Sequence, residues 1–306
     1  MSSYRVLSLD GGGIRGLITA ILLERLEEAH PSFLSHIDLF AGTSTGGLLA
    51  LGLASGMATK EIRSLYEEKG KRIFSHSFLD DILDMGNLIG AEYSIGPLKR
   101  ALENLFGDKR LGDLPKKVLV SSFDLDNCPQ DMNRLRTWKA KFFHNYPGLD
   151  SDNDQKVVDV ALRTSNAPTY FPVYQGYVDG GVVANNPSVC AMAQALHPHT
   201  GGQDLEDIVL LSLGTGHNPR FLPQQEGDWG LLHWAPHMVD LALEGSAGLA
   251  DYQCRQFLDH RYYRINPVLP YPIGMDEVDK IPQMVEIAIQ VDLDGAIQWI
   301  NKHYLS

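Results

Sequence analysis

The sequence predicts an α/β fold of three layers, in which helices cover both faces of a mostly parallel central sheet. Two observations lead to this class. Short apolar runs bounded by glycine or aspartate recur along the chain of 306 residues, and longer segments with helical periodicity separate them. Buried strands of a parallel sheet have this continuous apolar character. Their alternation with helices is typical of a layered α/β architecture.

The expected strands are brief and rich in apolar residues, and they lie at residues 4–9, 37–41, 118–123 and 208–213. The first expected helix, 14–28, places Ile18, Ile21 and Leu22 on one side and glutamates on another. Thr59 is expected to cap a helix that runs to about residue 71. A further helix should begin at the Gly-Pro pair 96–97 and end near residues 106–107.

Towards the end of the chain, Pro282 suits a first helical turn, and the apolar spacing after it predicts one long closing helix that includes Ile297. Residues 219–236 are loop-like although they contain two tryptophans. The acidic stretch 148–155 lacks the glutamate-terminated spacing of a calcium loop. Without internal repeats or low-complexity tracts, residues 1–306 are interpreted as a single domain, with the informative motifs between residues 4 and 216.

The charge balance excludes some classes of partner. The formal net charge of −12 repels phosphate backbones, which argues against nucleic-acid binding and against docking on anionic membranes by charge alone. Three widely spaced cysteines predict neither a disulfide framework nor a thiolate zinc site. No apolar stretch has the length of a signal peptide or of a membrane span. A cytoplasmic protein, peripheral to a membrane at most, is the simplest expectation.

The first expected strand leads into DGGGIRG at residues 10–16. A glycine-rich turn that opens a helix presents bare backbone N–H groups to an anion, which is either a dinucleotide pyrophosphate or a developing oxyanion. A dinucleotide site expects an acidic residue at the end of the next strand. That strand ends in Phe40-Ala41-Gly42 without one. The nicotinamide-cofactor alternative is therefore disfavoured, and no cofactor is expected.

The second strand leads into GTSTGG at residues 42–47. Its G-x-S-x-G pattern between a strand and a helix is typical of a nucleophile elbow, with Ser44 as the nucleophile. Gly42 and Gly46 are needed because side chains there would collide with the tight turn. A serine hydroxyl requires a base. Of the 11 histidines, the seven that lie late enough in the chain stand in no recognisable motif after a strand, whereas Asp179 ends a short apolar segment and precedes two glycines.

These three motifs, in this order, resemble the patatin-like phospholipase family, as do the segments 166–172, 183–187 and 212–216. The resemblance covers residues 10 to about 216. It implies a patatin-like fold and a catalytic dyad of Ser44 and Asp179 that needs no metal. It also implies an oxyanion hole on the glycine-rich loop. The residues expected at that loop are Gly11, Gly12, Gly13, Arg15 and Gly16.

The resemblance further implies hydrolysis of acyl esters of phospholipids or acylglycerols at a transient membrane or micelle surface. An apolar rim is expected at residues 229–234 or 74–89, with a loop tucked onto the core as the alternative. Acyl transfer to another alcohol and a regulated, non-catalytic lipid-binding module are the rival functions. The lipid headgroup, the need for an activator and a homo-oligomeric state are left open.

Overall fold

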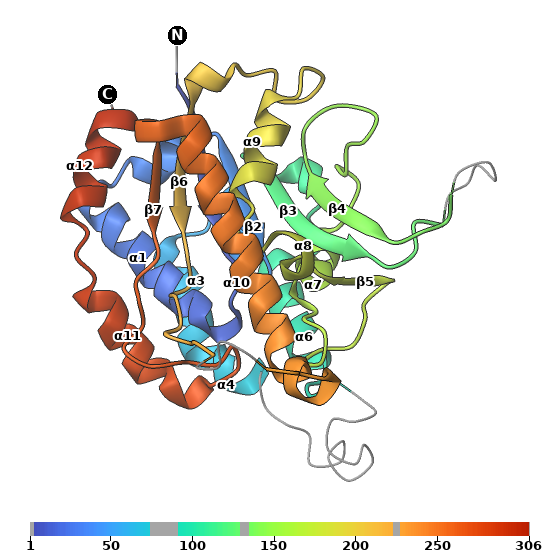
Figure 1. The fold of residues 1–306 in the computed structure, drawn as a ribbon. Coiled ribbons are helices and arrows are strands. Elements are labelled where there is room, and N and C mark those ends of the chain that lie inside the picture. Colours follow the sequence, from blue (N-terminus) through green and yellow to red (C-terminus); the bar gives the residue numbers. More distant parts are fainter. Residues whose placement is uncertain (1–2, 74–90, 129–134, 223–226, 306) are drawn as a thin grey trace.

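The computed structural model describes residues 3–73, 91–128, 135–222 and 227–305, and it contains one central sheet (Figure 1). The strand order is β4-β3-β2-β1-β6-β7, and β5 pairs with β3 outside this path. Neighbouring strands from β3 to β7 along this order run parallel, whereas β4 and β5 run antiparallel to β3. The strands are β1 (Tyr4–Leu9), β2 (Leu39–Thr43), β3 (Lys117–Asp124), β4 (Lys139–His144), β5 (Tyr177–Asp179), β6 (Ile208–Leu213) and β7 (Tyr262–Ile265).

Helices cover both faces of this sheet, which confirms the predicted three-layer class. On one face lie α9 and α10, which cross in front of the strands in Figure 1, and the other face packs against a larger layer that includes α1, α2 and α11. The helices are α1 (Gly16–Ala29), α2 (Thr45–Ala54), α3 (Thr59–Ser64), α4 (Gly70–Ile73), α6 (Gly96–Phe106), α7 (Val157–Ser165), α8 (Gly181–Ala184), α9 (Ser188–Leu196), α10 (Leu231–Leu258), α11 (Ile281–Gln290) and α12 (Asp294–His303).

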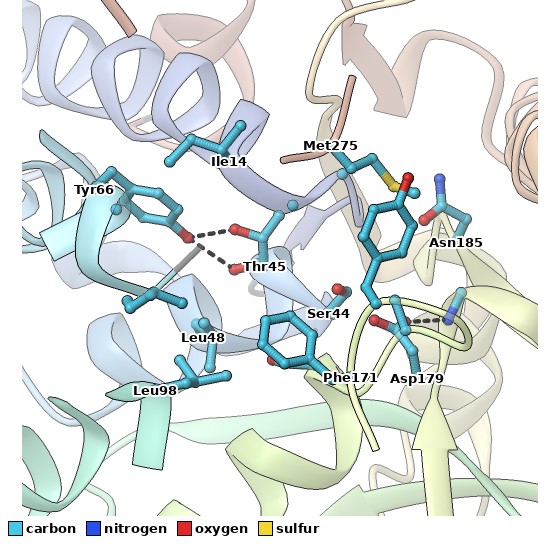
Figure 2. A pocket seen from close by; sticks show the side chains of 18 of the residues that line it. Ile14, Ser44, Thr45, Leu48, Tyr66, Leu98, Phe171, Asp179, Asn185 and Met275 are labelled. Atoms are coloured by element: carbon cyan, nitrogen blue, oxygen red, sulfur yellow. Dashed lines mark hydrogen bonds between the residues drawn. The ribbon is translucent and has the colours of Figure 1, made fainter. Parts of the chain in front are cut away.

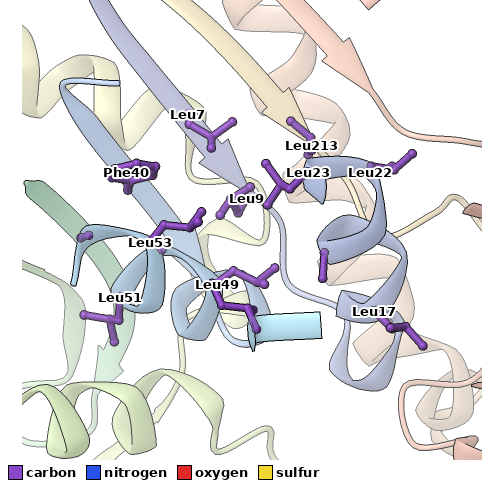
Figure 3. Packing of buried hydrophobic residues seen from close by; sticks show 14 of the residues in the cluster. Leu7, Leu9, Leu17, Leu22, Leu23, Phe40, Leu49, Leu51, Leu53 and Leu213 are labelled. Carbon is purple, nitrogen blue, oxygen red and sulfur yellow. The ribbon is translucent and has the colours of Figure 1, made fainter. Parts of the chain in front are cut away.

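Both faces of each central strand are buried, which explains the continuous apolar runs in the sequence. Leu7 and Phe40 join the core beneath α1 and α2 (Figure 3), whereas their neighbours Val6 and Leu39 join the core beneath α9 and α10. Because successive strand residues point to opposite faces, a strand with helices on both sides is apolar at most of its positions, and its few polar side chains, such as Ser8 and Ser212, are buried. The predicted bounds of β1 and β6 are confirmed.

Three local predictions are wrong. Thr59 does not cap its helix, because the extended residue Ala58 precedes the first turn and Thr59 is the first helical residue. The closing helix is two helices, since Val291 is extended and the Asp292 side chain accepts the Asp294 amide over 2.9 Å before α12 begins. Arg25 stabilises this break by donating to the carbonyls that end α11. The predicted loop at 219–236 ends early, because α10 begins at Leu231.

The register of the sheet brings two loops together at one edge. Leu9 at the end of β1 pairs with Gly42 near the end of β2, so the segments that follow them leave the sheet side by side. In open α/β sheets, ligands bind outside the carboxyl ends of the strands. Among the described residues, the helices are too short or too polar to cross a bilayer.

Candidate active site

Ser44 stands alone between β2 and α2 in a strained conformation. Its φ of 53° and ψ of −124° lie in a region that residues with a side chain rarely adopt. The flanking glycines permit this turn. A Cβ on Gly42 would lie 2.0 Å from the Gly46 carbonyl oxygen, and one on Gly46 would lie 2.1 Å from the Leu9 carbonyl oxygen. The elbow geometry expected from G-x-S-x-G is therefore present.

The elbow is also held from outside. The Ser44 amide donates to the Thr164 hydroxyl on α7 over 2.8 Å, and this hydroxyl is fully buried. The amide is consequently not free to bind a substrate anion. Thr164 lies 120 positions after Ser44 in the chain, in a segment without a motif, and the sequence offered no signal for it.

Asp179 ends β5 and lies close to Ser44 (Figure 2). Its amide donates to the Asn166 carbonyl over 3.0 Å, and its Oδ1 accepts the Gly181 amide over 2.7 Å. The side chain is only 4% exposed. Burial raises the pKa of Asp179 to about 6, against the opposing effect of hydrogen bonds from the Ser44 side chain and the Gly181 amide. At neutral pH this carboxylate is mostly ionised.

Some backbone amides of the glycine-rich loop donate to carbonyls within the protein, and others line the cavity that contains Ser44. The Gly11 amide donates to the Asn185 carbonyl over 3.0 Å, and the Gly16 amide donates to Gly13 within the following turn. Gly12 and Gly13 line the same cavity as Ser44, and their amides have no acceptor among the described residues. Of the expected loop residues, Gly11 and Gly16 therefore have amides engaged within the protein, whereas Gly12 and Gly13 do not among the described residues.

No larger residue fits at these two positions. A Cβ on Gly12 would lie 2.1 Å from the Thr215 hydroxyl oxygen. Gly13 has a φ of 60°, and a Cβ there would lie 2.1 Å from the Met275 carbonyl oxygen. The loop thus approaches the Thr215 side chain and the Met275 backbone closely, which is the reason for its glycines.

The loop is anchored by residues far along the chain. Arg264 on β7 donates to both carboxylate oxygens of Asp10, over 2.6 and 3.2 Å. The Thr215 hydroxyl donates to the Gly11 carbonyl over 3.0 Å, and the Ile14 amide donates to the Met275 carbonyl over 2.7 Å. Sequence reasoning missed Arg264 and Met275, which lie beyond the recognised motifs.

Arg15 does not line the cavity that contains Ser44. It is buried, and its guanidinium donates over 3.5 Å to the carbonyls of Gly12 and Gly216. It faces a separate polar cavity of about 250 Å³, whose walls include Glu244 and Arg264. Burial lowers the pKa of Arg15. Its contact with the expected oxyanion loop is therefore through the Gly12 carbonyl.

The cavity around Ser44 measures about 290 Å³ and has mainly apolar walls (Figure 2). Ser44, Asp179, Gly12 and Gly13 meet at one part of it, and no described histidine lines it. Asn185 also lines this cavity, although the sequence analysis did not assign it to the site. Among the described residues, no group of three or more His, Cys, Asp or Glu side chains is arranged to hold a metal. The walls include Ile14, Leu48, Leu98, Leu102, Phe171 and Leu243.

The two stretches expected at the rim have different outcomes. Residues 74–89 lie outside the described residues. Trp229 is half-buried, and its ring packs 5.1 Å from that of Trp234, which is exposed in the first turn of α10. This stretch is therefore neither a free loop nor a segment buried in the core.

Comparisons with known proteins identify the family of the chain. The family model described as Patatin-like phospholipase matches residues 7–189. The chain is 31% identical to the putative sporulation hydrolase CotR of Bacillus subtilis, over 99% of each chain. It is 34% identical to a cGAMP-activated phospholipase of Pseudomonas aeruginosa, over 86% of this chain and 78% of the relative. Patatin-like protein 2 of Arabidopsis thaliana is 28% identical over 81% and 70% of the two chains. The chain belongs to the patatin-like phospholipase family.

Proposed function

We propose that this protein is a lipid acyl hydrolase of the phospholipase A type, with Ser44 as nucleophile and Asp179 as base. The observation that carries the proposal is the convergence of four features in one apolar cavity: a serine on a strained elbow, a buried carboxylate beside it, and the two amides of Gly12 and Gly13. The cavity has room for an aliphatic chain beside the nucleophile.

The proposed reaction has two halves. Asp179 accepts the proton of Ser44 while Oγ attacks the ester carbonyl, and the Gly12 and Gly13 amides donate to the oxyanion that forms. Asp179 then gives the proton to the departing alcohol or lysolipid, which leaves an acyl-enzyme on Ser44. In the second half, water gives its proton to Asp179 and attacks this acyl group, and the fatty acid leaves as Ser44 regains its proton.

The raised pKa of Asp179 suits this role. An ordinary carboxylate is a weak base for a serine hydroxyl, because its pKa lies far below that of its partner. A pKa of about 6 brings the base closer to neutral pH and still leaves it ionised there. The anchoring of the glycine loop by Arg264, Thr215 and Met275 supports the second requirement, which is donors fixed in place before the reaction begins.

The rival functions differ in what they leave unexplained. A dinucleotide-binding role gives no purpose to the strained Ser44 or its carboxylate partner. A non-catalytic lipid-binding module would not need Gly12 and Gly13 amides that, among the described residues, have no acceptor. Acyl transfer would use the same acyl-enzyme with another alcohol in place of water. Assays with and without added glycerol separate transfer from hydrolysis.

We also propose that the chain is one domain and acts from the cytoplasm on a lipid surface. Strands from both ends of the described chain share one sheet, which supports the single domain. The three cysteines are unpaired, as expected in a reducing compartment. Nucleic acid is not an expected partner, given the net charge of −12.

The test is hydrolysis of a p-nitrophenyl medium-chain ester and of phospholipid micelles by the wild type and by Ser44→Ala. One relative is named as activated by cGAMP, so one arm of the assay includes that compound. We expect turnover by the wild type, with or without the compound, and background rates for Ser44→Ala. Equal turnover by both proteins in every arm would contradict the proposal.

A further inference from the structure

An exposed apolar surface borders the mouth of the Ser44 cavity. Phe221 is 83% exposed, Met238 57% and Leu241 50%, values unusual for such large apolar side chains. We call this surface the α10 rim, because it lies on the first half of α10 and on the segments beside it. Its members are Val182, Phe221, Leu222, Trp234, Met238, Val239 and Leu241.

The α10 rim is continuous with the inner wall of the cavity. Val182, Met238 and Val239 are exposed to solvent and also line the cavity that contains Ser44. An aliphatic chain that enters or leaves this cavity therefore passes over the rim. Because such chains come from lipid, a lipid surface is the expected partner of the apolar residues around the opening.

The rest of the rim is held beside α10 by an ion pair. Arg220, next to Phe221 in the chain, pairs with Asp240 on the helix. This pair fixes the segment that carries Phe221 and Leu222, and it neutralises one of the two acidic residues in the first half of α10. The other, Glu244, pairs with His217 over 2.9 Å. The apolar side chains are therefore presented without an unpaired acid on that half of the helix.

The charge of this region decides between kinds of lipid surface. The first half of α10, residues 231–244, contains no lysine or arginine, and the whole chain has a net charge of −12. Attraction to anionic headgroups needs clustered basic residues. Aromatic side chains such as Phe221 and Trp234 instead favour the boundary between headgroups and acyl chains, whatever the headgroup charge.

From these observations we propose that the α10 rim docks the enzyme on the surface of zwitterionic or uncharged lipid. Phe221, Trp234 and Leu241 enter the interface, and Met238 and Val239 lead a chain from it into the cavity. This inference rests on the proposed lipid hydrolase function, which it extends by naming the face and the class of surface.

The test compares two matched double variants by sedimentation with phosphatidylcholine vesicles. Phe221→Ser/Leu241→Gln removes apolar groups of the rim that do not line the cavity. Leu135→Gln/Leu149→Gln removes two apolar residues that are 78% and 111% exposed and do not line the cavity. We expect the rim variant to lose about tenfold or more in vesicle partitioning and vesicle hydrolysis, since binding scales with buried apolar area. Turnover of soluble p-nitrophenyl butyrate should stay within about twofold for both variants.

The outcomes separate this inference from the function on which it rests. Unchanged vesicle binding by the rim variant, or stronger binding when phosphatidylserine is added, would overturn the docking surface. A wild-type dimer that only the rim variant dissociates, with no vesicle binding, would assign the face to a second copy of the chain. Vesicle binding without turnover of any ester would leave the docking surface standing and overturn the hydrolase proposal.

Discussion

The Arg264 guanidinium donates hydrogen bonds to both carboxylate oxygens of Asp10, over 2.6 and 3.2 Å, although 254 positions separate the two residues in the chain. Both side chains are at least nine-tenths buried. Asp10 immediately precedes the glycine loop, and Arg264 also donates to the Ser212 hydroxyl on β6 over 2.7 Å. The ion pair therefore ties the start of the loop to two strands on the far side of β1.

We expect Arg264→Met to lower kcat more than it changes KM, because it frees the loop that carries the oxyanion donors while the apolar cavity stays intact. It should also lower the free energy of unfolding by about 3–5 kcal/mol, since it leaves a buried carboxylate unpaired. Steady-state kinetics and urea unfolding measure the two effects. The double variant Asp10→Asn/Arg264→Met should recover much of the stability, and failure to do so would contradict a paired charge.

The pH dependence of the reaction follows from Asp179. The carboxylate must be ionised to accept a proton, and its pKa is raised to about 6. We therefore expect kcat/KM for a soluble ester to rise about tenfold per pH unit below pH 6 and to level off above it. A profile that stays flat from pH 8 to pH 5 would contradict the assignment of Asp179 as the base.

Asp179 should also reduce the stability of the fold at neutral pH. Its pKa is about 6 in the folded protein and about 3.9 in an unfolded chain, so ionisation favours unfolding as the pH rises through 6. Asp179→Asn should therefore be more stable than the wild type at pH 8, by up to about 3 kcal/mol. The difference should shrink between pH 6 and pH 4. Urea unfolding at both extremes measures it, and a variant that is less stable at pH 8 would refute this reasoning.

Much of this site was predictable because its determinants are local. One tight turn requires Gly42 and Gly46, and the six residues 42–47 are enough to predict that turn. Which amides of the glycine loop already have an acceptor was not predictable, because this depends on which distant carbonyl lies near each amide. The Asn185 carbonyl accepts the hydrogen bond of the Gly11 amide, which only the folded structure shows.

The elements of the fold were likewise predictable only where their determinants are local. The apolar runs of β1 and β6 predicted their own bounds, since both faces of these strands are buried. The helix α10 was partly mistaken for a loop because Pro236 and exposed apolar residues at its start obscure the helical pattern. Its helical state depends on tertiary packing, in which its own residues Cys254 and Leu258 are buried in the core against the sheet.

Gly12→Ala should abolish most activity without unfolding the protein. The new methyl group would lie 2.1 Å from the Thr215 hydroxyl oxygen, so the loop must shift and carry its amides away from the oxyanion. We expect kcat to fall by about 10²–10³, the usual effect of losing one such donor. Gly245→Ala is the matched control, because a Cβ there meets no atom within 4 Å. Equal activity of the two variants would remove Gly12 from the proposed oxyanion hole.

The central claim is that Ser44 is the nucleophile and that Asp179 activates it. The most direct measurement is peptide mapping by mass spectrometry after incubation with a fluorophosphonate, which forms a stable covalent bond with an activated serine. We predict a single adduct on the peptide that contains Ser44, absent in Ser44→Ala and formed at least about tenfold more slowly in Asp179→Asn. An adduct on another residue, or ester hydrolysis that persists while Ser44 stays unlabelled, would contradict the account.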